Sequence, residues 1–128
     1  MKLGTVVSDD AMGAMGVLLS AKINKVAGMR ITRNIKKLEP AMEAYREART
    51  ALYAELGGER NEEGSEVKKP RQPEFNKRLK ELHDDELEIT VEQINASHLP
   101  DDIEPIVFLA LDWMIYDDIT DDQPASAA

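Results

Sequence analysis

Apolar residues recur at helical spacing through the middle of the chain. Between Ile31 and Leu56 they are three or four residues apart, which places them on one face of a helix about seven turns long. They are Ile31, Ile35, Leu38, Met42, Tyr45, Ala48, Leu52 and Leu56. Pro40 lies inside this pattern but off its apolar face, so it either kinks one long helix or begins the second of two. The unbroken spacing favours a kink or a tight junction, and so long a helix predicts a partner helix from the same chain or another subunit.

A second helical pattern precedes the long one. The tripeptide Ser8–Asp10 is typical of a helix start, because a hydroxyl can cap the first turn and acids are favoured there by the helix dipole. Gly28 is a stop signal. Gly13 and Gly16 either weaken the first turns or permit another helix to approach closely. The apolar positions of this predicted helix are Met12, Met15, Leu19, Ile23 and Val26.

The segment after the long helix has little to bury. Residues 57–73, GGERNEEGSEVKKPRQP, combine glycine, proline and mixed charge, so we expect a mobile charged loop. Pro73 then begins a helix whose apolar face is Phe75, Leu79 and Leu82.

The period changes again from Glu86 onward. Apolar and polar residues alternate over residues 87–92, which predicts a short, half-exposed strand. Its obvious mate is LGTVV at residues 3–7, since a lone strand leaves its backbone hydrogen bonds unmade. Glu104 and Pro105 begin the last predicted helix. The residues of that helix expected to face inward are Ile106, Leu109, Ala110 and Trp113, whereas Tyr116 is left undecided between core and surface.

Together these segments predict a mainly α fold. We expect a single helical domain over residues 1–122, with about four helices, a long kinked central helix and at most one small two-stranded β element. Residues 123–128 are predicted to be a disordered tail. The chain has no cysteine, no apolar run as long as a bilayer requires and no signal-peptide pattern at its start. These features predict an intracellular protein that does not enter membranes.

Charge is distributed very unevenly along the chain, although its net value is −9. Up to Lys80 there are sixteen basic and eleven acidic residues, a net charge of +5. From Glu81 onward there are fourteen acids and no Lys or Arg, a net charge of −14. The two parts either neutralise each other, within the fold or between subunits, or one of them binds an outside partner.

The basic stretch KINKVAGMRITRNIKK spans the predicted junction of the first two helices. Several of its cations are therefore expected near one helix end and one helix start, an arrangement that suits a phosphate or carboxylate. A nucleotide is the candidate ligand. Duplex DNA binding is not expected, because the pattern of a recognition helix is missing and fourteen acids would repel the duplex. The candidate anion-binding residues are Lys22, Lys25, Arg30, Arg33, Lys36 and Lys37.

Acids lie on both sides of the last predicted helix. Those before it are favoured by the helix dipole, whereas those after it are not and require basic residues, a partner or solvation. They form a candidate acidic face for a protein partner. Its residues are Asp101, Asp102, Glu104, Asp117, Asp118, Asp121 and Asp122.

No pattern of catalytic residues emerges from the chain. His83 stands beside Asp84 and Asp85, but neighbouring residues on a helix point apart, so these three do not predict a metal site. Neither a calcium-loop pattern nor a glycine-rich phosphate loop is found, and carboxylates are too abundant to mark a catalytic pair. We therefore expect a non-enzymatic protein with no metal and no cofactor.

Four stretches carry a resemblance to a known group of proteins. They are MKLGTVVS, RNIKKLEPAMEAYREARTALYAELG, FNKRLKELHDDELEITVEQI and PIVFLALDWMI. Their order and content resemble small uncharacterised proteins encoded by tailed bacteriophages and prophages. The resemblance covers nearly the whole chain, and its motifs are structural rather than catalytic. It implies a viral origin and a place in the cytoplasm of an infected bacterium or in the virion, and it transfers no catalytic residues.

Two functions fit these observations. The first is a phage protein that acts through protein–protein contacts in head or tail assembly or structure, as a monomer or a homo-oligomer. The second is an antagonist of a bacterial defence system, which either occludes a host protein with its acidic face or sequesters a nucleotide signal in its basic stretch. We favour the first, because the long apolar helix face and the segregated charge suit assembly.

Overall fold

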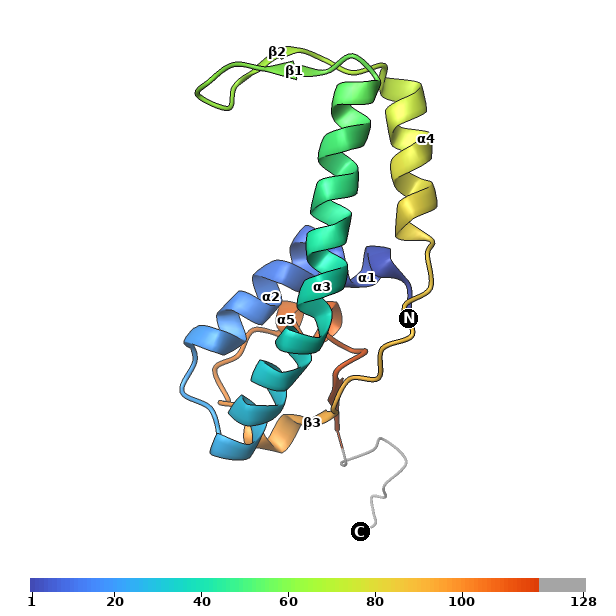
Figure 1. Cartoon of the computed structure of the whole chain (residues 1–128). Helices are drawn as coiled ribbons and strands as arrows, with labels where there is room; N and C mark the ends of the chain where they lie inside the picture. The colour runs from blue at the N-terminus through green and yellow to red at the C-terminus, as the bar shows by residue number, and fades with distance from the viewer. Residues whose placement is uncertain (118–128) are drawn as a thin grey trace. The chain divides into compact units, whose positions relative to one another are not determined.

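The structure is a computed structural model that describes residues 1–117, and it confirms the mainly helical fold (Figure 1). Its α-helices are α1 (Leu3–Val7), α2 (Asp9–Ser20), α3 (Lys25–Glu55), α4 (Gln72–His83) and α5 (Pro105–Ala110). The short 3-10 helix η1 covers Ala96–His98, and the strands are β1 (Glu59–Arg60), β2 (Glu66–Lys68), β3 (Ile94–Asn95) and β4 (Ile115–Tyr116).

The backbone groups into two compact units. The first comprises Met1–Ser8 and Leu38–Ile89, and the second comprises Asp9–Lys37 and the described residues from Thr90 onward. Helix α3 contributes its N-terminal part to the second unit and its C-terminal part to the first.

The long central helix is a single element. Helix α3 continues through Pro40, so the proline does not separate two helices. The predicted apolar face is buried at Ile31 and Leu38 and again at Leu52 and Leu56. Pro40 itself is exposed. The spacing of apolar residues therefore predicted this helix correctly.

The prediction of a single helix that precedes α3 and ends at Gly28 is wrong in its C-terminal half. Helix α2 ends at Ser20, and α3 begins at Lys25, so Gly28 lies inside a helix rather than after one. The cause is Asn24, whose side-chain oxygen accepts a hydrogen bond of 2.8 Å from the Val26 N–H, as a helix cap does. Asn24 lies between the predicted apolar positions Ile23 and Val26, and the cap that it provides starts a new helix there.

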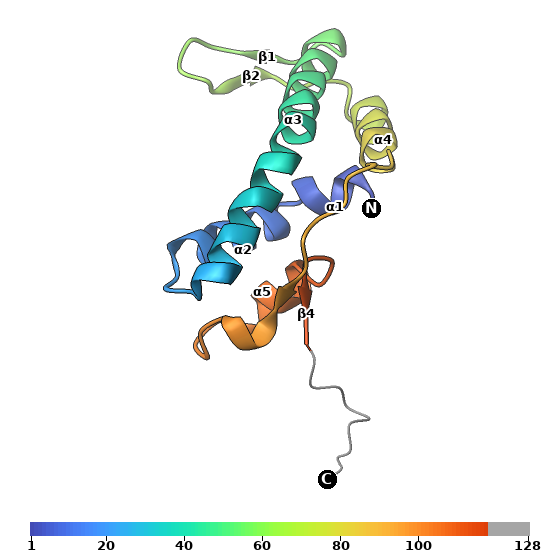
Figure 2. The ribbon, with the colours of Figure 1, turned by 60° about the horizontal axis from the view of Figure 1, so that its bottom comes forward.

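In the first unit, residues 3–7 form a helix instead of the predicted strand. Leu3, Val6 and Val7 are buried at helical spacing. Both ribbon views show α1 beside the end of α4 (Figures 1 and 2). The close approach requires Gly4, because a Cβ at that position would lie 2.8 Å from the Cβ of His83.

The predicted pairing of residues 3–7 with the strand at 87–92 is replaced by a single bridge between the neighbouring residues. Lys2 and Glu86 form an isolated antiparallel bridge, and the Leu3 N–H donates to the Asp85 carbonyl at 2.8 Å. Residues 87–92 are not in a regular strand, although the side chains of Leu87 and Ile89 are half-buried and their neighbours exposed. The alternation of residue types thus predicted burial correctly as far as Thr90, whereas Val91 and Glu92 are both half-buried, and it predicted secondary structure wrongly.

The charged segment 57–73 contains a short antiparallel hairpin, β1–β2, between α3 and α4 (Figure 1). Asn61 organises its turn by accepting hydrogen bonds from two backbone N–H groups, and Gly64 has the positive φ of 83° that the turn requires. At the base of the hairpin, Leu52 of α3 and Leu56, which directly follows α3, pack with Phe75 of α4. The mobility of this segment stays a prediction.

In the second unit, α2 packs against α5, and β3 lies parallel to β4. The predicted start of α5 is confirmed, but its inward face is not. Val107 and Leu111 are buried, whereas Ile106 and Leu109 are 54% and 71% exposed. The last helix thus turns two large apolar side chains to the surface, and Trp113 after it is half-buried.

Candidate partner-binding surface

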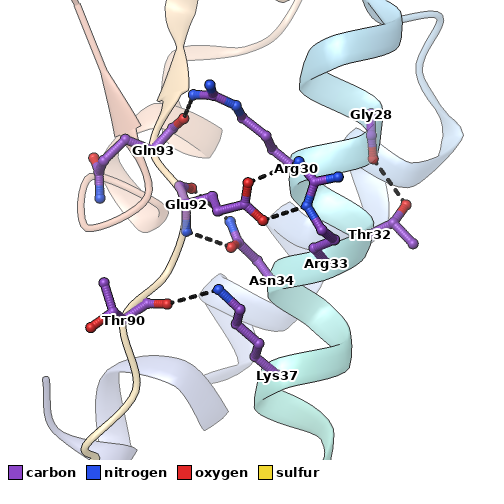
Figure 3. A network of polar contacts seen from close by, with 9 residues as sticks. All are labelled: Gly28, Arg30, Thr32, Arg33, Asn34, Lys37, Thr90, Glu92 and Gln93. Carbon is purple, nitrogen blue, oxygen red and sulfur yellow. Dashed lines mark hydrogen bonds and ion pairs between the residues drawn. The ribbon is translucent and has the colours of Figure 1, made fainter.

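Polar side chains of α3 hold the extended segment at residues 90–93 of the same unit (Figure 3). Arg30 donates to the Gln93 carbonyl at 2.6 Å, and Lys37 donates to the Thr90 carbonyl at 3.2 Å. Between these two residues, Arg33 donates two hydrogen bonds to the Glu92 carboxylate, one of 2.5 Å from Nε and one of 2.8 Å from Nη2.

Asn34 lies at the centre of this network and is fully buried. Its side-chain nitrogen donates to the Glu92 carbonyl at 2.8 Å, and its side-chain oxygen accepts from the Glu92 N–H at 2.7 Å. One side-chain amide therefore makes both hydrogen bonds that a neighbouring strand would have made.

The ion pair in the network changes the acidity of both partners. The hydrogen bond from Arg33 lowers the pKa of Glu92 below its usual value, against a smaller opposing effect of burial. The same hydrogen bond raises the pKa of Arg33. Both groups are partly exposed, so the pair contributes to the position of the segment more than to stability.

The six predicted anion-binding residues fall into two groups, three that bond to other residues of the chain and three that form no ion pair among the described residues. Arg30, Arg33 and Lys37 bond to their own chain in the network described above. The other three, Lys22, Lys25 and Lys36, make no ion pair with another residue in the described range. One part of the basic stretch is thus occupied by Glu92 and backbone carbonyls, which leaves fewer cations for an outside anion.

The predicted acidic face is described only in part. Asp101, Asp102 and Glu104 are exposed in the turn before α5, and none of them forms an ion pair with a residue in the range 1–117. Asp117 is also exposed and follows β4. The remaining members, Asp118, Asp121 and Asp122, lie outside the described residues.

A groove of about 960 Å³ runs between α2 and the segment that leads into α5. Its floor and walls are mostly apolar. Acids mark one side of it, because Asp102 and Glu104 also line the groove, and Lys22 is the one cation among its described lining residues. The apolar lining includes Gly13, Gly16, Val17, Ile103, Ile106 and Val107.

The surface around the groove is unusually apolar. From Ala11 to Ala21 the chain has no charged residue, and Met12, Val17 and Leu19 are exposed along α2. On the other side, Ile106 and Leu109 of α5 are exposed. Large exposed apolar patches on a protein mark sites of interaction.

This surface was not predicted from the sequence, for two reasons. Ile106 and Leu109 were expected in the core, and Gly13 and Gly16 were expected either to weaken the first turns of the helix or to let another helix approach closely. Ideal Cβ atoms at the two glycines would meet nothing within 4 Å, so the groove is open above them. The absence of charge in residues 11–21 was the signal that would have revealed it.

In the described part of the chain, no group of three or more metal-ligating side chains lies close enough to hold an ion. No helix in residues 1–117 combines the length and the apolar character needed to cross a bilayer. In comparisons with protein-family models, curated proteins and solved structures, no match to this chain was found.

Proposed function

We propose that this protein is a non-enzymatic bacteriophage protein that acts by binding a protein partner in head or tail assembly. The observation that carries the proposal is the apolar groove beside α2, with Val17 and Ile106 exposed at 47% and 54% on its two sides. The assignment to a phage rests on the resemblance described above.

The chemistry of the groove indicates the kind of partner. Its apolar lining between two elements suits the apolar face of an amphipathic helix, a common mode of recognition. The acids Asp102 and Glu104 line it, and Asp101 is exposed nearby in the sequence. A partner helix with Lys or Arg beside its apolar face would complement both features.

The proposal is tested by retrieving partners from bacteria that produce the phage. Tagged wild-type protein should retain a head or tail component, whereas Val17→Glu and Ile106→Glu should lose it, because each places a carboxylate in the apolar contact. The control is Val67→Glu, which makes the same change at a 60% exposed valine of the hairpin. Quantitative mass spectrometry measures the retained proteins.

Two outcomes would contradict this function. Equal retention of virion components by Val17→Glu and the wild type would show that the groove is not the contact. Normal yields of infectious particles from a phage that carries both groove substitutions would show that the contact is not needed for assembly.

A second candidate function is the occlusion of a host defence protein by the acidic residues. The exposure of Asp101, Asp102 and Glu104 without ion pairs among the described residues favours it. Reversing these three to Lys should then abolish the retention of a host protein and the protection of the phage against that defence. Sequestration of a nucleotide by the basic stretch has less support, since Arg30 and Arg33 are engaged within the chain.

A further inference from the structure

A second hollow, of about 610 Å³, lies in the first unit among α3, the hairpin and the start of α4. Its volume falls in the range of roughly 300–1,000 Å³ that is usual for small-molecule sites. Three arginines line it, Arg46, Arg49 and Arg60, together with a single acidic residue, Glu66. The hollow is independent of the groove beside α2, and nothing in the sequence analysis assigned it a role.

The arginines reach the hollow from two elements. Arg46 and Arg49 are one helical turn apart on α3 and share a face with Tyr53, because residues three and four apart lie above one another. Arg60 comes from β1 of the hairpin. The turn at Asn61 and Gly64, which fixes the hairpin, therefore also places the third guanidinium.

Tyr53 and the hairpin hold Arg60 in a defined position. Its guanidinium carbon lies 4.8 Å from the centre of the Tyr53 ring, and its Nη1 donates to the Gly64 carbonyl at 3.1 Å. The Tyr53 ring is fixed in turn, because it meets Phe75 edge-on at 6.1 Å and lies against Gly58, where a Cβ would be 2.5 Å from the ring. A guanidinium with five N–H donors keeps most of them available in this position.

The single carboxylate of the hollow is already engaged. The Tyr53 hydroxyl lies 2.5 Å from Glu66 Oε2 and donates to it. Burial, and then this hydrogen bond, raise the pKa of Tyr53, so the hydroxyl keeps its proton at neutral pH. The Arg49 side chain, by contrast, makes no hydrogen bond or ion pair with any residue that the structure describes, and the Arg46 side chain pairs only with Glu43 on its own helix.

We propose that the hollow lined by Arg46, Arg49 and Arg60 binds a small phosphate-bearing ligand. Planar guanidinium groups donate paired hydrogen bonds to phosphate oxygens, and three of them around one space suit a group with more than one negative charge. Arg60 lies over the Tyr53 ring, and Gly58 lies close to the same ring, so Tyr53 positions this arginine and is not assigned a role in stacking on a base.

Isothermal titration calorimetry of the full chain with pyrophosphate tests the proposal, with citrate as a carboxylate probe of similar charge. We expect saturable binding of pyrophosphate with one site per chain, weakened by added NaCl. Arg49→Ala and Arg60→Ala should each weaken it by about 10- to 100-fold, the loss expected for a hydrogen bond to a charged group. Glu66→Gln should tighten it, because it removes the one negative charge while keeping an acceptor for Tyr53.

The matched control is Arg78→Ala, since Arg78 belongs to α4 of the same unit but does not line the hollow. It should bind pyrophosphate as the wild type does, and circular dichroism should show all variants folded. Three results would overturn the proposal: no binding of pyrophosphate, equal weakening by Arg78→Ala, or equal affinity for citrate. The last would replace phosphate by carboxylate as the recognised group.

Discussion

At the scale of single residues, the most informative side chain is Asn34. A buried amide with two hydrogen bonds to one residue replaces the partner strand that the alternating pattern of residues 87–92 predicted. Local sequence does not identify Glu92 as the partner, because Asn34 and Glu92 are 58 residues apart and the bond forms only when the unit folds. A polar residue inside an otherwise apolar helix face was the sole indication.

Removal of this amide should destabilise the protein strongly. Asn34→Ala leaves the N–H and the carbonyl of Glu92 without partners at a partly buried position, which should lower the free energy of unfolding by about 2–4 kcal/mol. The control, Thr32→Ala, removes an exposed hydroxyl on the same helix and should cost less than about 0.5 kcal/mol. Urea denaturation followed by circular dichroism measures both, and similar losses would contradict the role given to Asn34.

At the scale of elements, a helix and its buried face were predicted correctly only where the apolar residues lie on one face and polar residues on the others. The long stripe of α3 has polar residues on every other side, so its spacing defined both the helix and its buried face. The segment PIVFLALDWM is apolar at every position except Asp112, and the spacing could not choose between Ile106 and Val107 as inward positions. Residues 3–7 are too short for either period to decide, and a strand was predicted there only as the mate that residues 87–92 would need.

Pro40 allows a prediction about the longest element. It lies inside α3, where it lacks the N–H that would bond one turn back, and it is exposed. Pro40→Ala should therefore raise the free energy of unfolding by about 1–3 kcal/mol. Thermal and urea denaturation measure the change, with Glu39→Ala as the exposed neighbour that should shift it by less than about 0.5 kcal/mol. A loss of stability in Pro40→Ala would mean that the helix depends on the proline.

At the scale of the whole molecule, two compact units share one long helix, and charge is segregated along the chain. The two opposite charges partly neutralise each other inside the second unit, where Glu92 of the acidic part forms an ion pair with Arg33 of the basic part. From the charge distribution, we expected either that the two parts neutralise each other or that one of them binds an outside partner. The charge distribution did not predict that Asp101, Asp102 and Glu104 would remain unpaired among the described residues, because that depends on which elements fold together.

The pH dependence of stability should reflect this pairing. The folded-state pKa of Glu92 is lowered, so its contribution is complete above the pKa of the unfolded chain and is lost as pH falls through the folded value. The free energy of unfolding, measured in urea, should therefore decrease from neutral pH to about pH 3 by less in Glu92→Gln than in the wild type. Glu88→Gln, at an exposed residue without an ion pair among the described residues, should keep the wild-type dependence.

Trp113 gives the molecule an optical reporter of its own. It is the single tryptophan of the chain, it belongs to the second unit, and its indole N–H donates to the Ala110 carbonyl at the end of α5. Tyr45 and Tyr53 belong to the first unit. Fluorescence excited at the red edge therefore observes the second unit alone, without any attached dye. The arrival of a partner beside α5 can be timed by the shift of that emission.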